Sequence, residues 1–196
     1  MGSSLMVQTP TQPITLETFL QLPETKPASE YINGQIIQKP MPQGKHSRIQ
    51  QKLLTVINEV VETESIALAL PELRCTFSGR SIIPDVAVFC WERLPVDENG
   101  TLANAFDAQP DWTIEILSPE QSSTRVTSNI LHCLASGCQL GWLIDPGEAL
   151  VQVYAPDKAL VSLENPDAIL PVPEFAAGLK LTVGQVFGWL KLRVKA

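Results

Sequence analysis

Two acidic residues lie in apolar surroundings where a carboxylate rarely stands without a partner. Asp85 follows Pro84 at the start of "VAVF", and Glu115 lies inside "WTIEIL". A carboxylate buried alone is costly, so each needs a cation, a hydrogen-bond donor or water on its face. Two carboxylates on adjacent strands can share Mg2+, which takes oxygen ligands and keeps several waters. The pair predicts a metal site; the alternative for Glu115 is a solvated edge strand or an ion pair with an arginine.

The chemistry that such a site supports is phosphodiester hydrolysis. A divalent metal activates water and neutralises the charge that develops on a phosphate. Efficient hydrolysis usually needs a further cation near the scissile phosphate, yet the residue two positions after Glu115 is Leu117. A small-molecule hydrolase lacks support, because neither His46 nor His132 can be matched with a Ser or Cys nucleophile.

Helices and strands that could position these residues follow from the apolar spacing and the turn residues. Their order predicts a mixed α/β (α+β) domain, in which helices flank a central mixed β-sheet and an N-terminal helix and hairpin precede it. The expected elements are a helix capped by Thr15, a hairpin at Asn33-Gly34, an amphipathic helix from His46 to about Glu64, strand segments "IALALPELRCTF", "SIIPDVAVFC" and "DWTIEILSP", a helix from Ser122 or Ser123 to Gly137, two strands joined at Pro146-Gly147, and a terminal helix capped by Thr182.

The length and composition indicate one globular domain. Of 196 residues, 44% are apolar, and we expect residues 14–196 to form the domain and residues 1–13 a loose, flexible tail. No apolar run is long enough to span a membrane and no signal peptide is evident, so we expect a cytoplasmic protein without membrane partners. The cysteines lack the spacing of a zinc site, and we expect them to be buried free thiols.

The net charge of −7 excludes a global basic footprint for nucleic acid. A local patch is available at the start of the long helix, where Lys45, His46 and Arg48 are clustered, with Lys39 and Arg80 as further candidates. Backbone N–H groups at that helix start would also favour an anion. The alternative is that these basic residues are scattered solvent-exposed charges.

Four sequence blocks, in order, resemble one known family. "EYINGQIIQKPMPQGKHSRIQ", "SIIPDVAVF", "WTIEILSPEQS" and "GCQLGWLIDP" are similar to blocks of the Uma-two domain family, restriction-endonuclease-like proteins abundant in cyanobacteria. The resemblance covers roughly residues 14–190. It implies the restriction endonuclease-like core of the nucleases whose signature is Pro-Asp, then Asp or Glu, one residue, then Lys.

The resemblance also assigns residues. It places the Pro-Asp pair on Pro84 and Asp85, the second metal carboxylate on Glu115, and a further acidic contributor on Glu30. It matches His46 to the histidine that opens the long helix, where a metal ligand, a phosphate contact, a helix-start residue and an ordinary surface histidine all remain open.

The family's lysine is the point of departure. In the family it lies on the helix after the second carboxylate, and that position falls on Asn129, which carries no charge. Arg125 lies one helical turn earlier and is a candidate for binding phosphate, but it cannot act as a base. Its alternative is a solvated charge at the helix start.

The resemblance implies a DNA endonuclease that depends on Mg2+ or Mn2+. The expected catalytic set is Asp85, Glu115, Glu30, Asn129 and Arg125, with Asp85 and Glu115 as the metal ligands. A homodimer is expected only by analogy with the fold. The alternative function is a catalytically degenerate nuclease fold that binds nucleic acid or protein.

Overall fold

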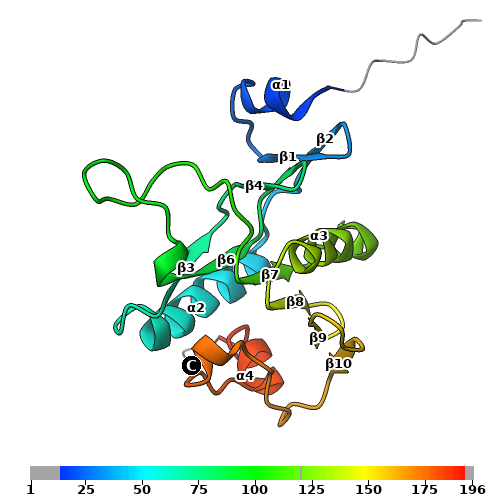
Figure 1. Cartoon of the computed structure of the whole chain (residues 1–196). Coiled ribbons are helices and arrows are strands. Elements are labelled where there is room, and N and C mark those ends of the chain that lie inside the picture. The colour runs from blue at the N-terminus through cyan, green and yellow to red at the C-terminus, as the bar shows by residue number, and fades with distance from the viewer. Residues whose placement is uncertain (1–13, 120, 193–196) are drawn as a thin grey trace, which may run out of the picture.

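The computed structural model describes residues 14–119 and 121–192, and the tail predicted at 1–13 lies outside them. Within these two ranges the chain folds into two β-sheets, four α-helices and two 3-10 helices (Figure 1). The helices are α1 (Leu16–Leu20), α2 (Gly44–Val61), η1 (Trp91–Arg93), α3 (Ser123–Ala135), η2 (Glu174–Ala176) and α4 (Val183–Gly188). The strands are β1 (Ser29–Ile32), β2 (Gln35–Gln38), β3 (Ala67–Pro71), β4 (Cys75–Phe77), β5 (Arg80–Ile82), β6 (Val86–Cys90), β7 (Trp112–Ile116), β8 (Leu140–Asp145), β9 (Leu150–Tyr154) and β10 (Val161–Leu163).

The larger sheet is mixed, as the sequence predicts. Its six strands run in the order β10-β9-β8-β7-β6-β3, and β7 and β8 form its parallel pair. Helix α3 connects these two parallel strands and packs on both of them, as a crossover helix does in a βαβ unit. Every residue of β6 and β7 is buried, so the centre of this sheet is covered on both faces.

A second, four-stranded sheet is the main departure from the expected single central sheet. It has the order β2-β1-β5-β4 and lies with α1 at one end of the molecule (Figure 1). Two segments predicted to be continuous strands are each divided between the sheets. Pro84 interrupts the segment "SIIPDVAVFC" between β5 and β6, because proline offers no N–H to a strand ladder. The segment "IALALPELRCTF" is divided between β3 and β4 and turns at Glu72, which has a positive φ.

The predicted hairpin and the caps at Thr15 and Thr182 are confirmed, whereas Ser122 precedes α3 without a side-chain cap hydrogen bond. Asn33 and Gly34 both have positive φ, 51° and 82°, which is the turn that fits the twist of a two-residue hairpin. The hydroxyl of Thr15 caps α1, and Thr182 forms a capping box with Gln185 at the start of α4. Helix α2 begins at Gly44, slightly before the predicted His46.

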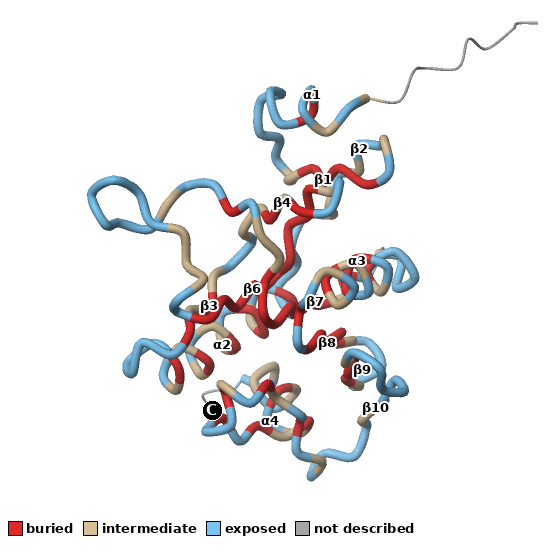
Figure 2. The backbone as a smooth tube through the Cα atoms, viewed as in Figure 1, coloured by how far each residue is buried: buried red, intermediate tan, exposed pale blue. Residues whose placement is uncertain are grey.

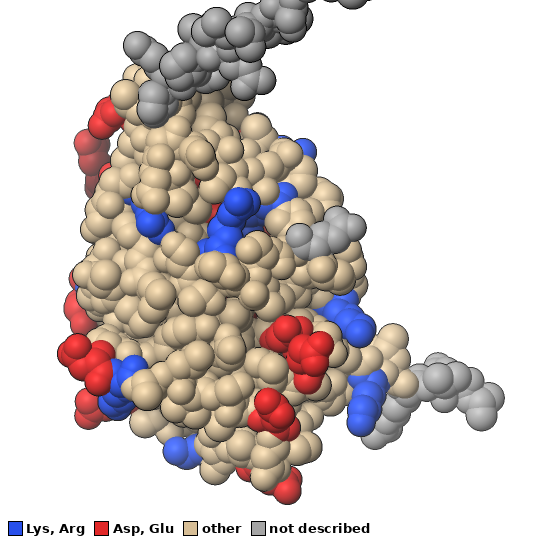
Figure 3. Space-filling view, turned by 90° about the vertical axis from the view of Figure 1, so that its right-hand side faces the viewer, with Lys and Arg blue, Asp and Glu red and all other residues tan. Residues whose placement is uncertain are grey.

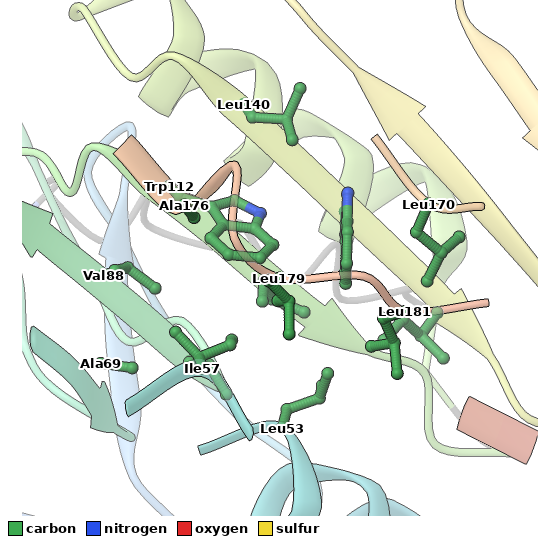
Figure 4. Packing of buried hydrophobic residues seen from close by; sticks show 14 of the residues in the cluster. Leu53, Ile57, Ala69, Val88, Trp112, Leu140, Leu170, Ala176, Leu179 and Leu181 are labelled. Carbon is green, nitrogen blue, oxygen red and sulfur yellow. The ribbon is translucent and has the colours of Figure 1, made fainter. Parts of the chain in front are cut away.

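The main core lies between the large sheet and α2. In Figure 4, Leu53 and Ile57 of α2 point toward Val88 and Trp112 of the sheet, and Leu179 from the C-terminal segment joins them. The rings of Trp112 and Trp142 meet edge to face at 4.7 Å between centroids. This packing holds the strands that carry the two acidic residues.

Helix α3 covers the opposite face of the large sheet. It approaches closely enough that a Cβ on Gly141 of β8 would lie 2.3 Å from Cγ2 of Ile130, so this position requires glycine. The four cysteines are buried and free, as predicted. Exposed backbone is concentrated in the loop between η1 and β7 and in the outer turns (Figure 2). No helix in the two described ranges is long and apolar enough to cross a membrane.

Candidate active site

Asp85 and Glu115 meet on one face of the large sheet. Asp85 directly precedes β6, Glu115 lies in the adjacent antiparallel β7, and the pairing of Val86 with Ile114 sets the two acidic residues opposite each other. Residues directly opposite in an antiparallel pair project to the same face. Both side chains are only 3% exposed. Both acidic residues therefore lie in the protein interior, and the alternative that Glu115 lies on a solvated edge strand is wrong.

The cation beside these carboxylates is Lys39, which follows β2. Its Nζ lies 2.8 Å from Oδ1 of Asp85 and 3.5 Å from Oε2 of Glu115. The same ammonium donates to the carbonyl of Ile83 at 2.6 Å. The backbone N–H of Lys39 donates to Ala28 on the neighbouring side of the hairpin, so the residue is fixed at both ends.

The second carboxylate oxygen of Asp85 accepts two further hydrogen bonds. Nε2 of His46 lies 3.0 Å from Oδ2, and the backbone N–H of Ile116 donates to the same atom at 2.8 Å. The carbonyl oxygen of Asp85 accepts from Nε2 of Gln50 at 2.8 Å. His46 is thus a buried partner of Asp85 and not a surface residue, and it leaves Oδ1 facing Lys39.

Glu30 reaches the cluster from β1 of the small sheet. Its Oε1 accepts the backbone N–H of Ile83 at 2.8 Å, and its Oε2 accepts from Nδ2 of Asn129 at 3.1 Å. Glu30 and Asn129 are each 4% exposed. The amide of Asn129 therefore holds Glu30 in place. Through these two hydrogen bonds Glu30 connects the small sheet to α3 and to the segment before β6.

Burial and the neighbouring charges shift the pKa values of this cluster in different directions. Burial acts to raise the pKa of Asp85, but Lys39 and the hydrogen bond from His46 outweigh it and hold that pKa well below its usual range. Burial raises the pKa of Glu115 well above its ordinary value; Lys39 opposes this shift, and the charges of Asp85 and Glu30 add to it. Glu115 is therefore the carboxylate whose charge is least compensated.

The pKa of Lys39 follows from the same contacts. Burial acts to lower this pKa, but the charges of Asp85, Glu115 and Glu30 outweigh burial and raise it above the ordinary value. Lys39 is thus a permanent cation at neutral pH. This one ammonium thus faces three buried carboxyl groups.

The other predicted basic residues are distributed differently. Arg125 is exposed at the start of α3 and Lys45 is exposed at the start of α2, so both face solvent. Arg48 turns toward the C-terminal segment, where its Nε donates to the carbonyl of Trp189 at 3.4 Å. Arg80 lies against α3 at Ser128. On the face shown in Figure 3, one group of basic side chains lies above the middle, and acidic and basic side chains are interspersed over the lower part.

Two cavities flank the cluster and meet at His46, Ser118 and Gln121. The first, about 420 Å3, also contacts Lys39 and Asp85. The second, about 640 Å3, is lined in addition by the start of α2, including Lys45, by Ser123 at the start of α3, and by the turn at Asp145. The first cavity thus reaches the cluster at Lys39 and Asp85, whereas Glu115 lines neither cavity.

The donor set fits a hard divalent cation. Oδ1 of Asp85 and Oε2 of Glu115 converge on one cationic nitrogen, and carboxylate oxygens are the ligands that Mg2+ and Mn2+ prefer. Within 14–119 and 121–192, no group of three or more His, Cys, Asp and Glu side chains is arranged to hold a metal. A cation held by two carboxylates and several waters is the coordination typical of Mg2+.

Two residues of the cluster were not predicted from the sequence. Lys39 was expected only as part of a surface basic patch, and Gln50 was expected simply as part of the long helix. The sequence indicates the position of Lys39 through the hairpin, because Lys39 follows the second strand and Glu30 lies on the first. Glu30 pairs with Ile37, and Lys39, two residues after Ile37, projects to the same face. Gln50 follows His46 by one helical turn and therefore faces the same side of α2.

The two sheets and the cluster of Glu30, Asp85, Glu115 and Lys39 define a restriction endonuclease-like fold. A structure from Anabaena variabilis, described as a "putative nuclease belonging to DUF820", superposes with a TM-score of 0.90 at 59% sequence identity, covering 91% of this chain and 100% of that chain. The Uma2 family model, described as "Putative restriction endonuclease", matches residues 16–184. The chain therefore belongs to the Uma2 family, as the sequence resemblance predicts. No curated protein matches the chain.

Proposed function

We propose that this protein is a DNA endonuclease that depends on Mg2+ or Mn2+. The observation that carries this proposal is the convergence of Asp85 Oδ1 and Glu115 Oε2 on one position, held here by the ammonium of Lys39, beside a cavity that Lys39 and Asp85 line. Membership of a nuclease family supports a nucleic acid as the substrate.

The chain's own residues would hold and orient the reacting groups. Asp85 and Glu115 would bind the cation, and His46 with the N–H of Ile116 fixes the orientation of Asp85. Glu30 is tied to Asn129 and to the segment before β6, so it supports the cluster from the small sheet. When bound, the divalent cation supplies activation of water and stabilisation of charge on the phosphate.

The two cavities provide room for a nucleic acid backbone on both sides of the cluster. The start of α2 contributes Lys45 to the larger cavity, and helix starts favour anions. With a net charge of −7, binding must depend on such local contacts. Arg125, exposed on the adjoining helix α3, is a second candidate for a phosphate contact.

The direct test is nicking of supercoiled plasmid DNA with Mg2+ or Mn2+, with EDTA as the control. We expect metal-dependent nicking by the wild-type protein, and a loss of at least about 10³-fold in Asp85→Ala and Glu115→Gln. Glu164→Gln, which changes an exposed carboxylate far along the chain, is the matched control and should nick as the wild type does.

The alternative function is a nuclease fold that binds nucleic acid without cleaving it. The neutral Asn129 at the position of the family's helix lysine favours this alternative. Absence of metal-dependent nicking, together with retained DNA binding in Asp85→Ala, would replace the endonuclease proposal with this one.

A further inference from the structure

The two positions where a lysine would be expected are occupied by other residues. Leu117 stands two residues after Glu115, and Asn129 stands on α3. The side-chain amide of Asn129 donates a hydrogen bond to Glu30. Asn129 therefore holds Glu30 in place and does not take the role of the family's lysine. The charge must come from elsewhere if the site is to act on a phosphate.

We propose that Lys39, delivered by the β1–β2 hairpin, is the catalytic lysine of this site and contacts the scissile phosphate. The inference rests on the proposed function and deepens it, because it assigns the cation to the hairpin of the small sheet and not to helix α3, where the family pattern places it. Lys39 and Asp85 are separated by 46 residues, and only the fold brings them together.

The contacts of Lys39 distinguish it from a solvated surface lysine. Its side chain is 13% exposed, and its ammonium touches both metal-binding carboxylates as well as the carbonyl of Ile83. The contact with Asp85 uses Oδ1, the oxygen that His46 and Ile116 leave free. The ammonium is therefore held at the centre of the cluster.

The position of Lys39 also gives it access to substrate. The side chain lines the cavity of about 420 Å3 together with His46 and Asp85, at the boundary between the carboxylates and the open space. Its longest contact, 3.5 Å to Oε2 of Glu115, is the one that a phosphate oxygen can most easily replace once Glu115 binds a cation. An ammonium has three donors, so it can hold Ile83 and a phosphate oxygen together.

The proposal predicts that cleavage and cation binding respond differently to loss of the lysine. Lys39→Met should reduce plasmid nicking with Mg2+ by about 10²–10³-fold, the usual effect of removing one electrostatic group. Binding of Mn2+ or Ca2+, measured by calorimetry without DNA, should be retained or tighter, because the ammonium no longer competes for the carboxylates. Lys158→Met, an exposed lysine before β10, is the matched control and should behave as the wild type.

Rescue separates a catalytic from a structural role. Lys39→Arg should retain part of the nicking activity, and propylammonium should restore activity to Lys39→Ala, since the adjoining cavity admits a small amine. These two variants also decide the question if Lys39→Met fails to fold. Asn129→Lys in the wild-type background should not increase nicking, because the cation is already present and Asn129 is needed by Glu30.

The outcomes separate the two proposals. Nicking by Lys39→Met at the wild-type rate, with Asp85→Ala inactive, overturns the role of Lys39 and leaves the endonuclease proposal intact. Loss of Mn2+ binding together with activity in Lys39→Met, without amine rescue of Lys39→Ala, shows that the lysine only positions carboxylates. A wild-type protein that binds Mn2+ but nicks no DNA overturns the endonuclease proposal and the role of Lys39 together.

Discussion

The two sheets contribute to the site by different physical means. The large sheet presents Asp85 and Glu115 from neighbouring strands, whose backbone pairing fixes their spacing before any side chain is considered. The small sheet presents Glu30 and Lys39 from a hairpin, and these reach the cluster through side-chain contacts that converge on Ile83. The backbone register thus defines the carboxylate pair, whereas burial and long-range contacts define the lysine.

The largest difference in stability is expected between substitutions of the two carboxylates of the large sheet. Asp85→Asn places an amide where Oδ2 now accepts from His46 and Ile116, and we expect it to destabilise the protein by roughly 3–5 kcal/mol. Glu115→Gln removes the least compensated charge and should leave the free energy of unfolding at pH 7 unchanged or increased. Urea unfolding of the two variants measures the difference.

The pH dependence of stability sharpens the same contrast. The pKa of Asp85 is lower in the folded than in the unfolded protein. Its contribution to the free energy of unfolding is therefore fully present above the unfolded-state pKa of about 4 and is lost as the pH falls below that value. The pKa of Glu115 is higher in the folded than in the unfolded protein. Its contribution to the free energy of unfolding is therefore fully present below about pH 4 and is lost as the pH rises.

The expected readout is the melting temperature between pH 4 and pH 8 without divalent metal. Glu115→Gln should melt a few degrees above the wild type at pH 8, corresponding to on the order of 1 kcal/mol, and this gap should narrow toward pH 4. Addition of Mg2+ at pH 8 should raise the melting temperature of the wild type more than that of Glu115→Gln. A gap that widens toward acid pH would contradict the assignment.

An effect smaller than that of Asp85→Asn is expected where the small sheet meets α3. Asn129→Ala leaves Oε2 of Glu30 without its donor in a buried position, which should cost about 1–3 kcal/mol in urea unfolding. Leu131→Ala, on the exposed side of the same helix, is the control and should change stability by less than about 0.5 kcal/mol. Equal effects of the two substitutions would show that Asn129 does not hold the small sheet to the cluster.

The smallest effect is expected outside both sheets, at the start of α2. Lys45→Ala should leave the melting temperature unchanged and weaken DNA binding in the presence of Ca2+. Loss of one phosphate contact should reduce the slope of log K against log salt concentration by about 1. Lys158→Ala should leave that slope unchanged, and an unaltered slope in Lys45→Ala would remove this residue from the proposed interface.

The carboxylate pair was predictable because its determinants are local. An acidic residue at the start of the apolar run "VAVF" and another inside "WTIEIL" indicate strands by composition, and buried carboxylates in strands indicate a partner. The hairpin at Asn33-Gly34 and the caps at Thr15 and Thr182 were predictable for the same reason, since each depends on a few adjacent residues.

The lysine and the second sheet were not predictable, because both depend on contacts distant in sequence. Whether Lys39 is a surface charge or a buried ion-pair partner depends on where the hairpin folds over Asp85, 46 residues away. The division of "SIIPDVAVFC" between two sheets had a local signal in Pro84, but the sequence does not indicate that the strands on either side of the proline join different sheets.

Asp85, which directly precedes β6, also joins this strand to two further elements. Its carbonyl accepts a hydrogen bond from Gln50 of α2, and its carboxylate accepts one from Ile116 at the end of β7. Under the proposed function, we expect a lineage without cleavage to be freer to replace Glu115 and Lys39 than Asp85. Retention of the Pro-Asp pair in a related sequence is then a mark of a folded chain. Joint retention of residues matching Glu115 and Lys39 is the more informative criterion for choosing which relatives to assay.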